Sequence, residues 1–112
     1  MTEMARIGRE RLPNRRPALT GTIEYGGRPV RVTVGFSADG RPLELFARDA
    51  RPDTDRDFIL DDAAVVISRA LQHGDKLEQL ARGIGRLPDG TPSSIIGCIV
   101  DAAIELAKEA PA

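Results

Sequence analysis

"VTVGFSADGRPLELF", residues 32–46, is the stretch of the chain that decides the fold. Apolar side chains alternate with polar or small ones on both sides of the tetrapeptide SADG, residues 37–40. A period of two is typical of a strand with one buried face, and Asp-Gly is a frequent pair in turns. The stretch therefore predicts two antiparallel strands joined by a short turn.

The residues before this stretch add a strand to the sheet. Leu19, Ile23 and Tyr25 alternate with polar residues, and Gly26-Gly27 suits the positive φ angles of a two-residue hairpin turn. Short turns between consecutive strands favour an antiparallel meander with one buried face. The expected strands cover about 18–25, 29–36 and 42–48.

The residues after this stretch change to a helical period. In "DFILDDAAVVISRALQH", residues 57–73, we expect Phe58, Ala64 or Val65, and Leu71 to share an apolar stripe. The expected helices cover about 56–73, 76–83 and 93–108. The fold class is therefore α+β, with a three-stranded meander packed against three helices.

His73 is the single histidine of the chain, and its neighbours indicate a helix end rather than a catalytic site. Gly74 suits the left-handed conformation that follows the last turn of a helix. Asp75, with Glu78 three residues later, has the spacing of a capping box for the next helix. We expect His73 to end a helix.

Composition and charge place limits on the function. With 112 residues the chain is expected to form a single domain. Its 16 basic and 17 acidic residues are distributed unevenly: five arginines lie in residues 1–17, and six aspartates lie in residues 49–62. We expect a basic mobile arm over residues 1–17 and one domain over residues 18–110.

The single cysteine, Cys98, excludes an intrachain disulfide and a multi-cysteine zinc site. It lies in an apolar stretch without a nearby basic residue, so we expect an unreactive thiol. No apolar run approaches the roughly 18 residues of a membrane span, and the first residues lack the apolar core of a secretory signal. We expect a cytoplasmic protein with no catalytic residue, cofactor, metal or membrane contact.

The last expected helix is apolar over more than half of its circumference. A helix on a small sheet should be apolar on about a third, so the excess predicts burial on two sides. One explanation is a protein partner or a homodimer interface, and another is that the three helices pack around one another. The residues of the possible self-interface are Ile95, Ile96, Ile99, Val100 and Leu106.

Contact with a nucleotide or a nucleic acid is the alternative function. The basic arm, two strand arginines and the start of the last helix, with its free N–H groups, offer cationic or polar contacts for phosphate. The candidate residues are Arg11, Arg15, Arg16, Arg28, Arg31, Arg86, Ser93 and Ser94.

Three strings together resemble the TSCPD domain, the module near the C-terminus of vitamin B12-dependent ribonucleotide reductases. They are "RLPNRRPALT" (11–20), "VTVGFSADGRPLELF" (32–46) and "DDAAVVISRALQHGDKLEQL" (61–80), and the resemblance covers about residues 11–107. It implies a stand-alone relative of that module, associated with deoxyribonucleotide supply.

The same resemblance limits what the chain is expected to do. The radical-bearing cysteine and the cobalamin site of such reductases lie in a large barrel domain, which 112 residues cannot contain. The pairs of redox cysteines that recharge these enzymes are absent as well. No catalytic residue transfers to this sequence, so the resemblance implies a non-catalytic module that binds a protein partner or a second copy of itself.

Overall fold

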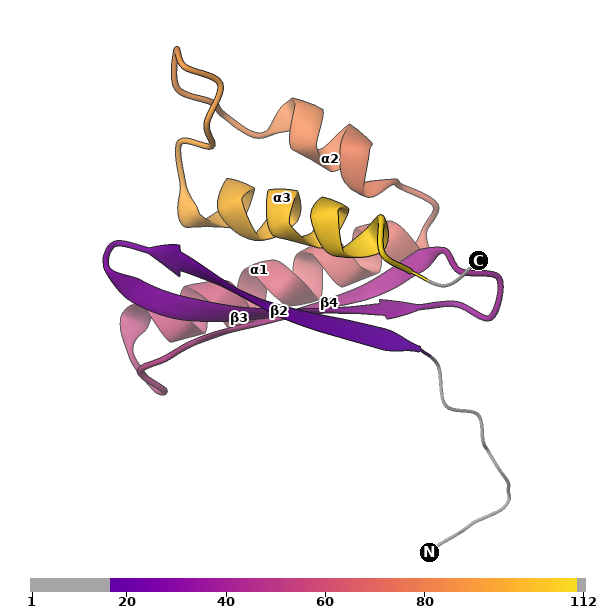
Figure 1. The fold of residues 1–112 in the computed structure, drawn as a ribbon, viewed down its shortest axis with the longest axis horizontal. Coiled ribbons are helices and arrows are strands. Elements are labelled where there is room, and N and C mark those ends of the chain that lie inside the picture. The colour runs from indigo at the N-terminus through magenta and orange to yellow at the C-terminus, as the bar shows by residue number, and fades with distance from the viewer. Residues whose placement is uncertain (1–16, 111–112) are drawn as a thin grey trace, which may run out of the picture.

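The computed structural model describes residues 17–110, and within this range three strands form one antiparallel sheet in the order β2-β3-β4. Three helices follow, as shown in Figure 1. The predicted α+β meander with three helices is confirmed. The elements are β2 (Ala18–Tyr25), β3 (Arg28–Phe36), β4 (Pro42–Asp49), α1 (Asp55–Gln72), α2 (Leu77–Gly83) and α3 (Ile95–Ala107).

The sheet has one buried face, and the central strand β3 supplies most of it. Val30, Val32 and Val34 are fully buried, while the residues between them lie on the other face. Gly26 and Gly27 have φ angles of 59° and 78°, so the first hairpin uses the left-handed turn that the sequence predicts.

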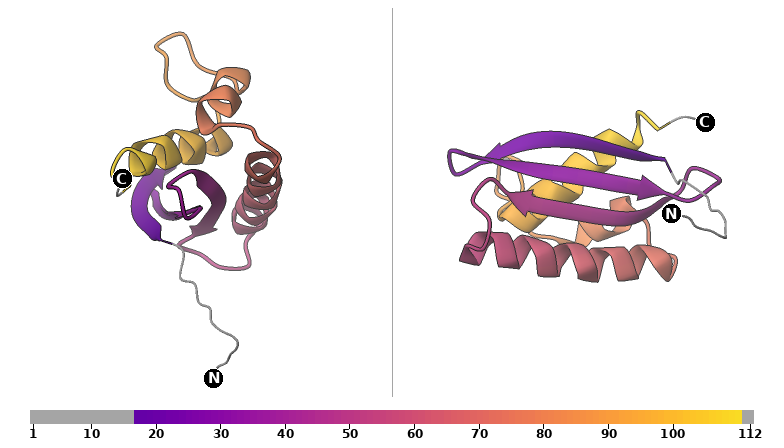
Figure 2. Two further views of the ribbon diagram at one scale, coloured as in Figure 1. Left: turned by 90° about the vertical axis from the view of Figure 1, so that its right-hand side faces the viewer. Right: turned by 90° about the horizontal axis from the view of Figure 1, so that it is seen from below.

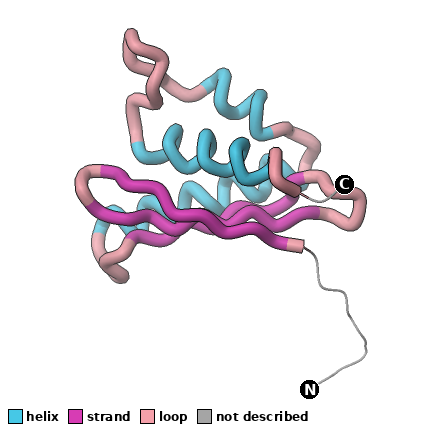
Figure 3. The backbone as a smooth tube through the Cα atoms, in the orientation of Figure 1, coloured by secondary structure: helices cyan, strands magenta, loops and turns pink. Residues whose placement is uncertain are grey.

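The helices cover the sheet unequally. Figure 1 and the left view of Figure 2 show α3 across one face of the sheet, with α2 stacked beyond it. In the right view of Figure 2, α1 runs alongside β4 at the edge, and the face of the sheet turned to the viewer carries no helix. Figure 3 shows the loop between α2 and α3 projecting from the body of the domain. Within residues 17–110, none of the helices is long and apolar enough to cross a membrane.

The buried stripe of α1 differs from the predicted one. Leu60, Ala64, Ile67 and Leu71 face the core at helical spacing, as does the carboxylate of Asp57. Ala64 and Leu71 therefore lie where the sequence predicts. Of the alternatives Ala64 and Val65 the structure buries Ala64, and the prediction was wrong for Phe58, whose side chain is exposed.

One of the predicted helix ends is found in the structure, and two lie at other residues than predicted. His73 caps the end of α1, and Gly74 follows with a φ of 109°, as predicted. Lys76, not Asp75, is the N-cap of α2, because the Gln79 side chain accepts the Lys76 N–H at 2.8 Å. Ser94 caps α3 by accepting the Gly97 N–H, so that helix begins at Ile95, two residues later than predicted.

Side chains of α1 bind the free edge of β4. The Ser68 hydroxyl accepts the N–H of Leu45 at 2.9 Å and donates to its carbonyl oxygen at 3.1 Å. The Gln72 side-chain amide donates to the carbonyl of Leu43. Because an unpaired strand edge can pair with another chain, these contacts protect the sheet from edge-to-edge association.

Replacing Ser68 by alanine is expected to leave both edge groups of Leu45 without their partner. A part-buried polar group without a partner costs about 1–3 kcal/mol, so we expect Tm to fall by roughly 5–10 °C in thermal unfolding. Ser93→Ala changes an exposed serine and serves as the control. Equal Tm values for the two variants would contradict a role for Ser68 at the edge.

Candidate functional site

Of the five predicted anion contacts within the described residues, the structure engages four in internal interactions, three through the side chain and Ser93 through its backbone N–H. Arg28 Nη2 lies 3.0 Å from Asp49 Oδ2. Arg86 binds both carboxylate oxygens of Asp101, at 2.9 and 2.7 Å. Ser94 caps α3, and the Ser93 N–H donates to the carbonyl of Gly85.

Arg31 differs from the other described candidates. Its side chain is exposed, and no carboxylate of residues 17–110 lies within ion-pair distance of it. Arg11, Arg15 and Arg16 lie outside the described residues, as does nearly all of the predicted arm.

The residues of the predicted self-interface lie mainly inside the chain. Ile99 and Val100 are 0% exposed, and Ile95 is buried as well. Ile96 and Leu106 are partly buried, and Leu106 lies over Gly21 of β2, where a Cβ would come within 3.2 Å of it. Packing of α3 against the sheet and α2 thus accounts for much of its broad apolar surface.

Two aspartates of the acidic segment have buried carboxylates that bind arginines within the fold. Asp57 accepts two hydrogen bonds from Arg48, at 2.9 and 2.7 Å, and one from each backbone N–H of Asp49 and Asp53. The Arg48 guanidinium, together with these N–H groups, holds the pKa of Asp57 well below its usual range. The acidic loop is therefore fastened to β4 at the start of α1.

Asp49 is the second buried carboxylate and lies at the end of β4. Arg28 and then Arg56 hold its pKa well below the usual range. Arg56 also donates to the carbonyl of Tyr25 and lies over the Tyr25 ring, 5.7 Å from its centre. These contacts tie α1 to the first hairpin.

The outer face of α1 is an apolar surface that sequence reasoning missed. It consists of Phe58, Ile59, Val65 and Val66, all of which are exposed, with Val66 at 68%. Beside it, a groove of about 490 Å³ is lined by α1 together with Ile84 and Ile96. A signal was present in the sequence, because Leu60, Ala64, Ile67 and Leu71 already form a complete stripe at helical spacing, which leaves the remaining apolar residues of the helix to face outward.

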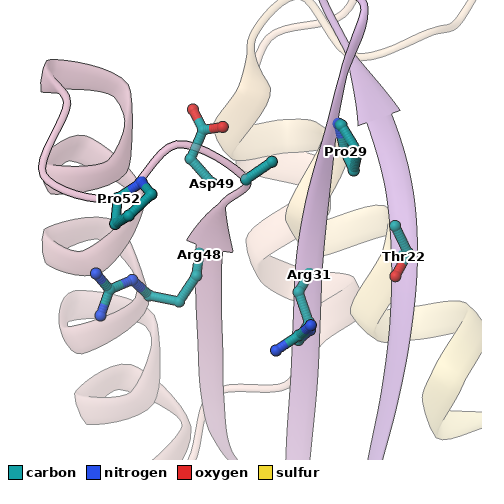
Figure 4. Close-up of a pocket in the computed structure, with 7 residues that line it drawn as sticks. Thr22, Pro29, Arg31, Arg48, Asp49 and Pro52 are labelled. Carbon is teal, nitrogen blue, oxygen red and sulfur yellow. The ribbon is translucent and has the colours of Figure 1, made fainter.

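A second hollow, of about 530 Å³, lies on the uncovered face of the sheet (Figure 4). Arg31 and Arg48 rise from neighbouring strands in Figure 4, with Thr22 on the other side of Arg31. Pro29, Asp49, Ala50 and Pro52 complete the lining.

The histidine and the cysteine show no activation. His73 Nδ1 lies 2.8 Å from the Arg69 carbonyl oxygen at the exposed end of α1. Burial, and to a lesser extent the charge of Asp101, raises the pKa of the Cys98 thiol, which disfavours the nucleophilic thiolate.

Comparison with known proteins relates this architecture to a family and to two enzymes. The family model of the TSCPD domain matches residues 6–107 of this chain. A vitamin B12-dependent ribonucleotide reductase of Rhodopirellula baltica is 37% identical over 70 residues, which are 62% of this chain and 7% of that protein. The corresponding reductase of Agrobacterium fabrum is 35% identical over 71 residues, which are 63% of this chain and 6% of that protein.

The chain thus spans less than a tenth of the length of these two relatives. No solved structure matches.

Proposed function

This chain belongs to the TSCPD domain family, and from that membership we propose that it is a non-catalytic accessory module that acts by association, with a second copy of itself as its partner. Its context is deoxyribonucleotide supply, because the two relatives are named as ribonucleotide reductases. The observation that carries the proposal is the outer face of α1.

The outer face of α1 has the properties of an interaction surface. Of the six exposed large apolar side chains among the described residues, four lie on this helix, and a fifth, Phe46, lines the groove between β4 and α1. Single exposed apolar residues are common on protein surfaces, but a contiguous group of them marks an interaction site. The neighbouring apolar groove at Ile84 and Ile96 extends this surface.

The charges that flank this face suit a second copy of the chain. Asp62 and Arg69 are exposed on α1, and neither forms an ion pair within residues 17–110. In an antiparallel pair of α1 helices centred between Val65 and Val66, Asp62 of one copy faces Arg69 of the other. Such a pairing is self-complementary, as a twofold interface requires.

The absence of catalysis is part of the proposal. Ribonucleotide reduction in the relatives belongs to proteins more than ten times longer than the matched segment. The thiol of Cys98 is disfavoured as a nucleophile by its raised pKa, and the ring nitrogen of His73 is engaged with a backbone carbonyl. These observations support a binding role for the chain.

Substituting Val66 by glutamate is expected to abolish self-association without unfolding the domain. A charge at this exposed position costs little in the monomer, but it would be buried without a partner in the pair. Light scattering at a low and a high protein concentration measures the mass. We expect the wild-type mass to rise toward that of two chains and the variant to stay at 12.1 kDa.

Leu87→Glu is the matched control, because Leu87 is a similarly exposed apolar residue in the loop beyond α2. We expect this variant to associate like the wild type. A wild-type protein that stays monomeric at both concentrations, or equal loss of association in both variants, would contradict the proposal.

Binding of a nucleotide or a nucleic acid is the second candidate function. Arg28, Arg86 and Ser94 are engaged in contacts within the fold, so the start of α3 gives it little support. Arg31 is the described residue that favours it, for the reasons set out below.

A further inference from the structure

Arg31 and Arg48 occupy directly opposite positions of β3 and β4. Thr22 of β2 lies opposite Arg31 on its other side, so the three residues form one row across the sheet (Figure 4). Like charges directly opposite each other in a sheet are destabilising. A pair of arginines at this position therefore needs negative charge nearby.

The described residues supply such charge to Arg48 and not to Arg31. Arg48 binds Asp57 at 2.7 Å. Asp49 contributes to the lining of the hollow, but its carboxylate is buried and is held by Arg28 and Arg56. Within residues 17–110, the guanidinium of Arg31 thus faces the hollow without an ion-pair partner.

The hollow has the size and the chemistry of a small-molecule site. Its volume of about 530 Å³ falls within the range of ligand pockets. Pro29, Ala50 and Pro52 give it apolar walls, while the Arg31 guanidinium and the Thr22 hydroxyl give it hydrogen-bond donors. Arg48 adds positive charge, although its Nε and Nη2 donate to Asp57. Guanidinium groups bind phosphate through two parallel hydrogen bonds.

We propose that this hollow binds a phosphate group, with Arg31 as its principal ligand and Arg48 and Thr22 as supporting donors. Guanidinium and hydroxyl groups are donors that bind the phosphate oxygens of a monoester and of a diester alike. The phosphate belongs to a nucleotide or to the backbone of a single-stranded nucleic acid. This site is separate from the outer face of α1, and it does not depend on self-association.

The test is a titration of the full chain with inorganic phosphate, with dAMP and with an oligodeoxythymidine of roughly ten nucleotides. Calorimetry measures the affinity of each probe, and NMR chemical shifts show whether the residues lining the hollow are affected. Chloride at matched ionic strength is the control for screening. We expect saturable binding that shifts the resonances of Thr22 and Arg31. Tighter binding of the oligonucleotide than of dAMP would identify a nucleic-acid backbone as the source, and equal binding would identify a nucleotide.

Two variants assign the binding to the hollow. Arg31→Ala is expected to weaken it roughly tenfold or more, and Arg31→Lys to weaken it less, because the charge is kept but the planar fork is lost. Arg82→Ala, at an exposed arginine of α2, should bind like the wild type.

Arg31 is exposed, so a thermal unfolding scan can show that each variant is folded before it is titrated. No saturable binding of any of the three probes, or equal weakening by Arg31→Ala and Arg82→Ala, would overturn the proposal. Both outcomes are distinct from a failure of self-association, which the substitutions on α1 measure.

Discussion

Replacing Ile99 by glutamate is expected to unfold the domain. Ile99 is 0% exposed and lies in the core where α3 packs on the sheet. An unpaired carboxylate buried there costs several kcal/mol, which is comparable to the total stability of a small domain. We expect the circular dichroism of the variant to show no cooperative thermal transition.

Two comparisons show that this effect comes from burial. Ile99→Val keeps the position apolar and should cost about 1 kcal/mol, and Val66→Glu places the same charge on the surface. A folded Ile99→Glu protein with a normal thermal transition would mean that this side chain is not in the core. It would then again be available for the self-interface predicted from the sequence.

Replacing Asp57 by asparagine is expected to have the second-largest effect. The carboxylate of Asp57 is fully buried and accepts hydrogen bonds from Arg48 and from two backbone N–H groups. Asparagine removes the charge and leaves a buried amide group facing donors. We expect Tm at pH 7 to fall by roughly 10 °C or more.

The pH dependence should change with the same substitution. The pKa of Asp57 is lower in the folded state than in the unfolded state, so its stabilisation is present above the unfolded pKa of about 4. The stabilisation is lost as the pH falls through the folded pKa. The wild-type Tm should therefore decrease more steeply than that of Asp57→Asn from about pH 5 to about pH 2.

Asp55→Asn is the control for the Asp57 substitution. Asp55 lies in the same first turn of α1 but is exposed, so this variant measures the effect of the helix dipole alone. Parallel Tm–pH curves for the wild type and Asp57→Asn would contradict the assigned ion pair.

The sheet could be predicted from the sequence because its signals are local. Alternation in Val30, Val32 and Val34 fixes the buried face, and the glycine pair fixes the first turn. Gly74, which has a positive φ directly after α1, marks the end of that helix in the same local way. Each of these signals depends on neighbours within a few positions along the chain.

The candidate surfaces could not be predicted in the same way, because they depend on which apolar residues find a partner within the chain. The apolar residues of α3 exceed what the sheet can cover, yet Ile99 and Val100 are buried once α2 and the sheet are in place. On α1 apolar residues make up a smaller share of the helix, but Val65 and Val66 remain exposed. Arg28 lies on the same side of β3 as Val30 and pairs with Asp49, whereas Arg31 lies on the other face, so the alternation of the strand separates the two arginines.

The most direct test of the account is methyl NMR with a soluble paramagnetic probe at a low and a high protein concentration. We predict that the methyl groups of Val66 and Ile59 are accessible to the probe at the low concentration and protected at the high one. Those of Ile99 should be protected at both. Val66 methyl groups that are equally accessible at both concentrations would contradict the claim that α1, rather than α3, provides the association surface.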